Sequence, residues 1–267
     1  MSSIIVAGPW IGEFGYELFR WQGHLRYLAQ EYEEVIIAGR PGHSVLYNDF
    51  ATKYCAFNCS VGTNAADGRH CGVDTDLVSL SEQLFAGIPY THMVCSEQKV
   101  IDTDPQMFKR YGTRGVCSGY DVVIHARNID VDDGVMLDHH KAQKESRNWD
   151  YSQWIELMNE LPQRATIACI GTVDAAYHIP STVDLRGIAL GKLTDILANS
   201  RLVVGPSSGP IHLASLCGCP HVTWGEPHLE QRYAQAWNPL ATPMQFIVDE
   251  HYNPAAQTVV AAMRNIT

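Results

Sequence analysis

The sequence predicts an α/β protein made of two compact, doubly wound, Rossmann-like domains that face each other across a cleft. Short apolar runs, typical of buried parallel strands, alternate along the chain with segments of helical periodicity. The alternation restarts near residue 120, so we expect a first domain over residues 1–118 and a second over 119–267. A small-residue turn between a strand and a helix, residues 205–209, is the kind of loop that holds phosphate at the edge of such a sheet.

The first domain is expected to open with a βαβ unit. The apolar run 4–7 predicts a strand, and the turn 8–15 leads into helical periodicity over residues 17–30. A second strand, 34–38, ends in the turn 39–42. Because crossovers between parallel strands are right-handed, the helix has only one way to pack on the sheet.

Residues 44–118 carry a weaker signal. Short apolar segments, such as 76–80 and 92–95, are separated by Gly, Asn and Asp. We expect irregular loops there, with one or two further strands.

The second domain repeats the alternation with more elements. Strands are predicted at 120–125, 166–170, 202–204 and 221–224, and helices at 151–161, 190–199 and 210–216. A polar loop covers 127–149, and the segment 183–187 precedes the helix at 190. The C-terminal residues 255–267 look helical, and we expect them to pack back on the first domain.

The composition is that of a globular protein with a substantial core. The 267 residues are 46% hydrophobic and 18% charged, with a formal net charge of −10. This charge argues against a broad basic surface for nucleic acid, although it leaves room for a local basic groove. No apolar run approaches the roughly 20 residues of a membrane span, and the start lacks the features of a signal peptide. We therefore expect a cytoplasmic protein.

Four residues of the first domain are candidates for a zinc site. Cys55, Cys59 and Cys71, with His70 beside the last, follow no standard zinc spacing. Three others lie in apolar segments where a reduced thiol packs: Cys169, Cys217 and Cys219. We expect neither a metal site nor a disulfide framework.

Several motifs stand in a characteristic order in the second half: Asp184-Leu-Arg-Gly187, Ser200–Gly205, Ser208–Ala214 and Gly218–Val222. Their order and spacing resemble the nucleotide-sugar domain of heptosyltransferases, which have the two-domain glycosyltransferase-B (GT-B) fold. Gly12-Glu-Phe-Gly15 is similar to the first loop of that family, so the likeness covers most of both halves. In the family an acidic residue usually stands at the position of Ser207. Locally, His125–Asp130 matches the His-x-Arg-x-x-Asp pattern of fucosyltransferases of the same fold.

The resemblance implies a glycosyltransferase whose catalytic base is Glu13. A sugar hydroxyl is a poor nucleophile until a carboxylate accepts its proton, and Glu13 matches the acidic position of the family's first loop. A solvated loop carboxylate is the alternative, and Glu17 is the fallback base. Gly12 and Gly15 would let the backbone approach the ligand closely. Direct displacement with Glu13 as base would invert the anomeric configuration.

Two arginines are candidates for holding a diphosphate. Arg127 ends a predicted strand and would point into the crevice, where a guanidinium can bind two phosphate oxygens and offset leaving-group charge. The fucosyltransferase-like pattern implies the same catalytic role. A salt bridge to Asp130 or Asp132 is the alternative. Arg147, near Lys144, falls near the family's basic residue that contacts donor phosphate.

The turn after the strand at 202–204 offers further donor contacts. Hydroxyls and backbone N–H groups of Ser207, Ser208 and Gly209 can cradle an anion at a helix start, although Ser is also a common N-cap. His212 follows the family pattern, with a core histidine as the alternative. Glu226 could bind ribose hydroxyls, with a surface turn as the alternative.

Asp130-Val-Asp132 resembles the Asp-x-Asp metal motif of the other large glycosyltransferase fold. The same spacing recurs at Asp74-Thr-Asp76 and Asp102-Thr-Asp104, so it carries little information here. In the GT-B fold a helix dipole and arginines replace a metal. We expect no metal, and no cofactor apart from the nucleotide-diphosphate sugar that serves as donor substrate.

Two other functions remain open at the level of sequence. A sugar-nucleotide epimerase or hydrolase can share the fold, and a non-catalytic nucleotide-sugar-binding module is a third possibility. The acceptor site would be built from residues 44–115, which resemble nothing identifiable. A lipid-linked sugar, a small glycan and a hydroxylated base in DNA all remain open as acceptors. The base and sugar of the donor, and the oligomeric state, are not determined by the sequence.

Overall fold

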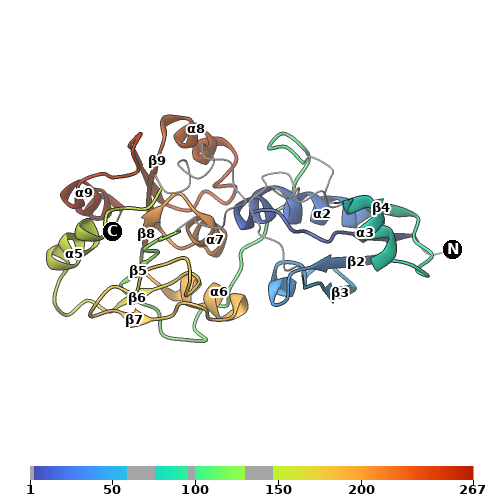
Figure 1. Ribbon diagram of the computed structural model, residues 1–267, viewed down its shortest axis with the longest axis horizontal. Helices are drawn as coiled ribbons and strands as arrows, with labels where there is room; N and C mark the ends of the chain where they lie inside the picture. The colour runs from blue at the N-terminus through green and yellow to red at the C-terminus, as the bar shows by residue number, and fades with distance from the viewer. Residues whose placement is uncertain (1–2, 59–75, 96–99, 130–146, 267) are drawn as a thin grey trace. The chain divides into compact units, whose positions relative to one another are not determined.

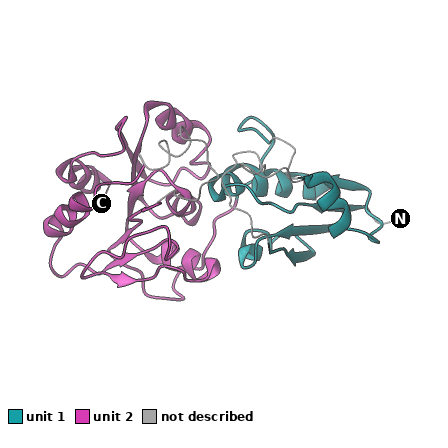
Figure 2. Cartoon of the chain, viewed as in Figure 1, with its two compact units in different colours: residues 1–108 teal, residues 109–267 magenta. Residues whose placement is uncertain are grey.

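The computed structural model describes residues 3–58, 76–95, 100–129 and 147–266, and the chain divides into two compact units. Unit 1 comprises residues 1–108 and unit 2 residues 109–267 (Figure 2). The sequence-based boundary between 118 and 119 lies a short distance further along the chain. The segment before it belongs to unit 2 because its backbone bonds there: Tyr111 N–H donates to Leu216 O at 3.0 Å, and Thr113 N–H to Asp195 Oδ1 at 2.8 Å.

Unit 1 contains a four-stranded parallel sheet. Its strands are β1 (Ile4–Ala7), β2 (Glu34–Gly39), β3 (Lys53–Ala56) and β4 (His92–Val94), in the order β3-β2-β1-β4. Between β1 and β2 the chain forms α1 (Phe14–Tyr16), a π-helical segment η1 (Glu17–Trp21), α2 (Gln22–Leu28) and the 3₁₀ turn η2 (Ala29–Glu31). The predicted βαβ unit is present, with its helix starting three residues earlier than expected, at 14 instead of 17.

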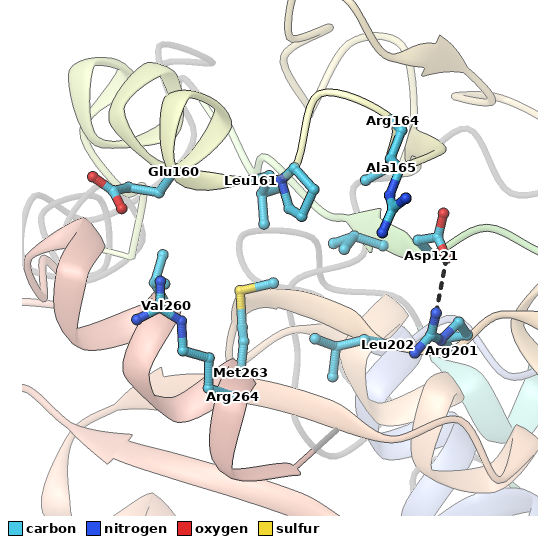
Figure 3. Close-up of a pocket in the computed structure, with 12 residues that line it drawn as sticks. Asp121, Glu160, Leu161, Arg164, Ala165, Arg201, Leu202, Val260, Met263 and Arg264 are labelled. Carbon is cyan, nitrogen blue, oxygen red and sulfur yellow. Dashed lines mark hydrogen bonds and ion pairs between the residues drawn. The ribbon is translucent and has the colours of Figure 1, made fainter.

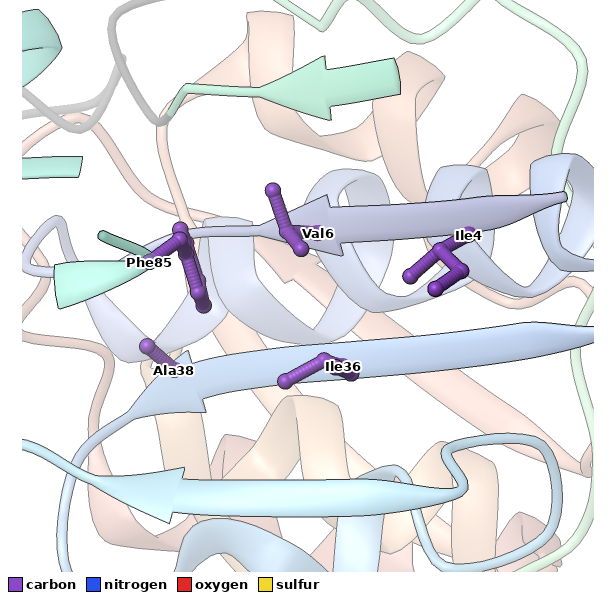
Figure 4. Packing of buried hydrophobic residues seen from close by; sticks show 5 residues of the cluster. All are labelled: Ile4, Val6, Ile36, Ala38 and Phe85. Carbon is purple, nitrogen blue, oxygen red and sulfur yellow. The ribbon is translucent and has the colours of Figure 1, made fainter. Parts of the chain in front are cut away.

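Side chains alternate across this sheet, as a strand requires. Ile4, Val6, Ile36 and Ala38 share one face and pack with Phe85 (Figure 4). Phe85 directly follows helix α3 (Leu77–Leu84). All five are buried, so this face forms the core between the sheet and α3.

The region between 44 and 118 is more regular than the sequence indicated. It contains the expected strands, β3 and β4, and also α3 and most of the 3₁₀ helix η3 (His43–Leu46). Asp76 caps α3 by accepting from Val78 N–H at 3.1 Å and Ser79 N–H at 3.0 Å. A helix of eight residues shows too little periodicity to be told from a strand, so α3 was missed.

Unit 2 contains a six-stranded parallel sheet in the order β10-β9-β8-β5-β6-β7. The strands are β5 (Val122–Ile124), β6 (Ile167–Cys169), β7 (Val183–Asp184), β8 (Val203–Pro206), β9 (His221–Gly225) and β10 (Met244–Val248). The helices are α5 (Tyr151–Glu160), α6 (Leu190–Asn199), α7 (Gly209–Cys217), α8 (Pro227–Gln235) and α9 (Ala256–Ile266). Of these elements, α8 and β10 lie in a stretch where the sequence had predicted none.

The connections of this sheet reverse direction between β5 and β8. From β5 the chain moves outward through β6 to β7, and from β8 it moves the other way through β9 to β10. Because crossovers are right-handed, α5 and α7 cover opposite faces of the sheet (Figure 1). The doubly wound topology creates a switch point between β5 and β8, where ligands bind in folds of this kind.

Helix α9 packs against α5 and against β9 and β10 within unit 2. The expected packing of residues 255–267 on the first domain stays a prediction. In the described part of the chain, no helix combines the length and the apolar character needed to cross a membrane.

Candidate functional site

The carboxyl ends of β5 and β8 bring together two motifs that are far apart in sequence. The strands pair in parallel, with Val123 opposite Val203 and Ile124 opposite Val204. His125 follows β5, and its Nδ1 shares a hydrogen bond of 2.8 Å with Ser208 Oγ, which follows β8. The two segments therefore form one cluster at the switch point of the sheet.

Helix α7 begins at this cluster. Ser208 is its N-cap residue, yet the Ser208 side chain makes no capping bond, because its hydroxyl is engaged with His125. The first N–H groups of α7 and the positive end of its dipole thus lie beside the His125–Ser208 pair, an arrangement that suits an anion. Gly218, with a φ of 70°, ends the helix in the left-handed conformation that favours glycine.

Ser207 has a different environment from Ser208. Its side chain is buried and its hydroxyl lies 3.2 Å from the Tyr233 hydroxyl, while its N–H donates to Trp224 O at 2.9 Å. The Ser207 hydroxyl thus has a partner inside unit 2, whereas Ser208 and Gly209 lie at the start of α7, and the anion cradle there stays a prediction. Contact of Ser207 with a ligand stays a prediction.

His125 is held neutral by its surroundings. Burial, and then the charge of Arg127, lower the pKa of its imidazole to about 3. A neutral ring can share one hydrogen bond with Ser208 without adding charge to the site. Through this bond it holds the Ser208 side chain at the start of α7.

This low pKa predicts a pH-dependent stability. Below pH 6.5 the unfolded chain protonates His125, whereas the folded chain does so only near pH 3, so stability is lost as the pH falls through this window. Each such histidine contributes a slope of about 1.4 kcal/mol per pH unit. We expect His125→Asn to flatten the slope by about this amount in urea unfolding between pH 7 and 4.5. The exposed His178→Asn is the control, and an equal slope in His125→Asn and the parent chain would contradict the prediction.

Arg127 is buried at the end of β5 and is fixed by Asn148. Its Nη1 donates to Asn148 Oδ1 at 2.5 Å. Asn148 also accepts from Ile129 N–H at 3.1 Å and donates to Ile129 O at 3.0 Å, so it holds both the guanidinium and the loop after β5. Asn148 adjoins Arg147, and no pattern in the sequence marks it. The alternative partners of Arg127, Asp130 and Asp132, lie outside the described residues, as does Lys144.

Arg147 is half-buried, and its Nε–H is buried without a hydrogen-bond acceptor among the described residues. A buried donor of this kind is costly unless it binds a partner. Its charge also acts on Tyr252: burial raises the pKa of that phenol, and Arg147 and Arg127 oppose the rise. The charges of the two arginines therefore both act on one side chain.

Tyr252 is a site residue that sequence reasoning missed. It is buried with a φ of 54°, a left-handed conformation that is rare for a bulky residue and is often found at functional sites. Trp224 Nε1–H donates to its carbonyl oxygen at 3.0 Å, and its ring packs on Gly225, where a Cβ would come within 3.0 Å of it. Neither periodicity nor any motif marks this position.

Glu226 and His212 occupy the flanks of the cluster. Glu226 follows β9, stands at the N-cap position of α8 without a side-chain capping bond, and pairs through Oε2 with His228 Nδ1 at 3.1 Å. The His212 ring is buried 4.5 Å from the Trp237 centroid and 5.5 Å from that of Tyr233, and burial lowers the pKa of His212 to about 3. His212 thus lies in an aromatic cluster, as a core histidine would. The donor-binding roles of both residues stay predictions.

In unit 1, Glu13 lies on the loop between β1 and α1. It is half-buried, and its carboxylate makes no capping bond to the helix that follows it. Gly12 before it is buried. Gly8 has a φ of 106°, and a Cβ there would lie 2.2 Å from Ala38 O, so only glycine fits where the chain leaves β1.

Glu17, the fallback base, is fully buried and has three partners. Tyr47 OH donates to it at 2.8 Å, His43 Nδ1 lies at 2.9 Å and Arg40 Nη1 at 3.3 Å. Burial alone raises the pKa of Glu17. The neighbouring His43, Arg40 and Tyr47 together lower it by more, so the net shift is downward. A carboxylate that is ionised, shielded and fully bonded is a poor proton acceptor for a substrate, which leaves Glu13 as the candidate.

The other polar clusters noted in the sequence have structural roles where they are described. Asp102 accepts from Arg20 Nε at 2.8 Å, Asp104 accepts from Ile101 N–H at 2.7 Å, and Asp76 caps α3. Cys55 lies half-buried on β3 as a free thiol. Cys59, His70, Cys71 and Asp74 lie outside the described residues.

A pocket of about 480 Å³ lies at the opposite edge of the unit 2 sheet (Figure 3). Asp121 and Leu202, which line it, come just before β5 and β8, and Arg201 pairs with Asp121 at 3.3 Å. Since ligands of doubly wound sheets bind at the carboxyl ends of the strands, this hollow is separate from the His125–Ser208 cluster.

Comparison with known structures places the whole chain in one fold. A glycosyl transferase family 9 structure from Veillonella parvula DSM 2008 is 10% identical, with a TM-score of 0.61, over 99% of this chain and 97% of that one. E. coli ADP-heptose LPS heptosyltransferase II is 12% identical, with a TM-score of 0.64, over 99% and 98%. E. coli heptosyltransferase WaaC with ADP-2-deoxy-2-fluoro heptose is 11% identical, with a TM-score of 0.53, over 99% and 100%. The predicted GT-B type of fold, with two Rossmann-like domains, is thereby confirmed.

A comparison with curated proteins gives no match. The family described as glycosyltransferase family 9 (heptosyltransferase) matches residues 121–259, just over half of the chain and nearly all of unit 2. This stretch includes His125, Arg127, Ser208, Glu226 and Tyr252. The chain therefore belongs to glycosyltransferase family 9, the heptosyltransferase family, and is a glycosyltransferase.

Proposed function

We propose that this glycosyltransferase moves a sugar from a nucleotide-diphosphate sugar to a hydroxyl acceptor, with inversion at the anomeric carbon and without a metal. The observation that carries the proposal is the cluster at the β5–β8 switch point. There Ser208 opens α7 while bound to His125, and Arg127 lies three residues after the neighbouring strand, β5. Amide donors, a helix dipole and a guanidinium at one strand edge suit a diphosphate.

The first donor to test is an ADP-linked heptose. Two of the similar structures are an ADP-heptose LPS heptosyltransferase and a heptosyltransferase with an ADP-heptose analogue. Glu226 directly follows β9, and its carboxylate could accept hydrogen bonds from ribose hydroxyls. We assign it that role.

In the proposed reaction, Glu13 accepts the proton of the acceptor hydroxyl as its oxygen attacks the anomeric carbon. The bond from that carbon to the diphosphate oxygen breaks, and the nucleoside diphosphate leaves with the electron pair. Arg127, Arg147 and the first amides of α7 stabilise the charge that develops on it. Attack on the face opposite the leaving group inverts the configuration.

We propose that no metal is needed because Arg127, Arg147 and the start of α7 already supply positive charge. Two guanidinium groups and the positive end of α7 together can offset the charge of a diphosphate, which is the task a divalent cation performs elsewhere. We therefore expect transfer to persist in EDTA.

The test combines ligand binding with product analysis. We expect ADP and ADP-heptose to raise the melting temperature, with and without EDTA, more than the UDP, GDP or CDP counterparts do. Incubation with ADP-heptose and candidate acceptors should then yield an inverted glycoside by NMR. A product of retained configuration would refute the mechanism, and ADP release at the same rate without acceptor would point to a hydrolase.

A further inference from the structure

The loop that carries Glu13 is fastened by an arginine from the neighbouring strand end. Arg40 follows β2, and its Nη2 donates to Ile11 O at 2.9 Å and also to Gly12 O. The Gly12 carbonyl belongs to the peptide group that joins Gly12 to Glu13. Arg40 therefore holds the backbone directly before the proposed base.

The same peptide segment is fastened from its other side. Glu17 N–H donates to Glu13 O at 3.1 Å, so the carbonyl of Glu13 itself is bound to the first turn of the helix. The Glu17 side chain in turn pairs with Arg40 Nη1 at 3.3 Å. Arg40 and Glu17 thus bind the backbone on both sides of Glu13 and also bind each other. The Glu13 carboxylate itself makes no capping bond.

Arg40 is itself held in place by several groups. Its carbonyl oxygen accepts from Tyr54 OH at 2.7 Å, and Glu17 is oriented by Tyr47 and His43. The Glu17 side chain has no exposed surface, and that of Arg40 is only 18% exposed. In such a shielded environment, charged hydrogen bonds are strong and their geometry is well defined.

We propose that Arg40, oriented by Glu17, is a positioning residue for the transfer reaction, and that it acts by fixing the loop so that Glu13 reaches the acceptor hydroxyl. This inference rests on the proposed function of Glu13. A general base must sit within hydrogen-bond reach of its proton, and displacement by about 1 Å can lower the rate about 100-fold. A guanidinium has the planar fork needed to bind two carbonyls and a carboxylate together, which a lysine ammonium lacks.

The test compares the same conservative substitution, arginine to lysine, at two buried arginines of unit 1. Arg26 is also buried in unit 1: it pairs with Asp49 at 2.7 Å and donates to Leu46 O at 2.9 Å and Met107 O at 3.1 Å, away from the Glu13 loop. We expect Arg40→Lys to lower kcat about 10- to 100-fold, with the KM for the donor changed less than about twofold. Arg26→Lys should lower the melting temperature comparably and leave kcat within about twofold. Equal effects of the two variants on kcat would overturn the proposal.

A double-mutant cycle separates failure of this inference from failure of the proposed function. If Arg40 acts through Glu13, Arg40→Lys adds little further loss of kcat once Glu13→Gln is present. A full additional loss in that background shows that Arg40 does not act through Glu13 and overturns the inference alone. If Glu13→Gln by itself keeps normal kcat, the proposed base is wrong and the positioning role falls with it. Should Arg40→Lys fail to fold, Tyr47→Phe, which loosens Glu17, is expected to lower kcat about 2- to 10-fold, and an unchanged kcat in this variant overturns the inference.

Discussion

Glu13→Gln is expected to lower kcat by about 100- to 10,000-fold, because a positioned general base contributes about that factor. Glutamine keeps the size and polarity of the side chain but cannot accept the proton of the acceptor hydroxyl. The donor contacts proposed here belong to unit 2, whereas Glu13 belongs to unit 1, so the KM for the nucleotide sugar should change less than about twofold. The measurement is steady-state transfer at saturating acceptor, with donor binding followed by thermal shift.

Glu33→Gln is the matched control for this variant. Glu33 is an exposed carboxylate of the same unit, so its neutralisation makes the same change of net charge without touching the loop after β1. We expect its kcat to equal that of the parent chain. If Glu13→Gln retained more than about a third of normal kcat, another group would have to accept the proton. Glu17 is a poor replacement because its carboxylate is buried and bonded to three side chains.

Arg127→Lys is expected to lower kcat/KM for the donor by roughly 30- to 150-fold, corresponding to about 2–3 kcal/mol for a charged hydrogen bond lost in the transition state. Lysine keeps the positive charge but loses the planar fork that binds two phosphate oxygens. It also gives up the bond to Asn148, so the loop at Ile129 is less firmly held. Transfer kinetics over a range of donor concentrations provide the measurement.

Arg201→Lys is the control for Arg127. Arg201 belongs to the same unit but precedes β8, at the opposite edge of the sheet, where it pairs with Asp121. Its substitution should leave donor kinetics within about twofold. If the two variants behaved alike, the effect would be one of general charge and not of phosphate binding at the switch point.

Local patterns in the sequence were sufficient to predict most of unit 2. Its central strands are buried on both faces and therefore appear as short apolar runs such as Val122–Ile124 and Val203–Val204. The glycine and serine turn before α7 predicted a candidate phosphate-binding loop, because small residues at a strand-to-helix junction have a specific physical use. The stretch that forms α8 and β10 was missed. The apolar residues of this stretch are too few and too widely spaced to show the periodicity of a helix or of a strand.

The candidate site could be predicted only in part, since its contacts join distant segments. His125 and Ser208 are 83 positions apart and meet only because β5 pairs with β8. Asn148 becomes important only when it lies against Arg127 and Ile129. The charges of Arg127 and Arg147 act on Tyr252 only in the folded chain, and no sequence pattern marks this position.

By itself, the sequence determined the alternation of strands and helices, the family likeness and the residue types that suit a glycosyl transfer, because each depends on short-range patterns. The resemblance named Glu13 as the proposed base and Glu17 as the fallback, and only the tertiary structure revealed how differently these two acidic residues are surrounded. Burial and three bonded neighbours hold Glu17 as a structural anion, while Glu13 stays half-buried on a loop fastened by Arg40. The difference in environment between two like carboxylates is set by packing and hydrogen bonding, which no local pattern encodes.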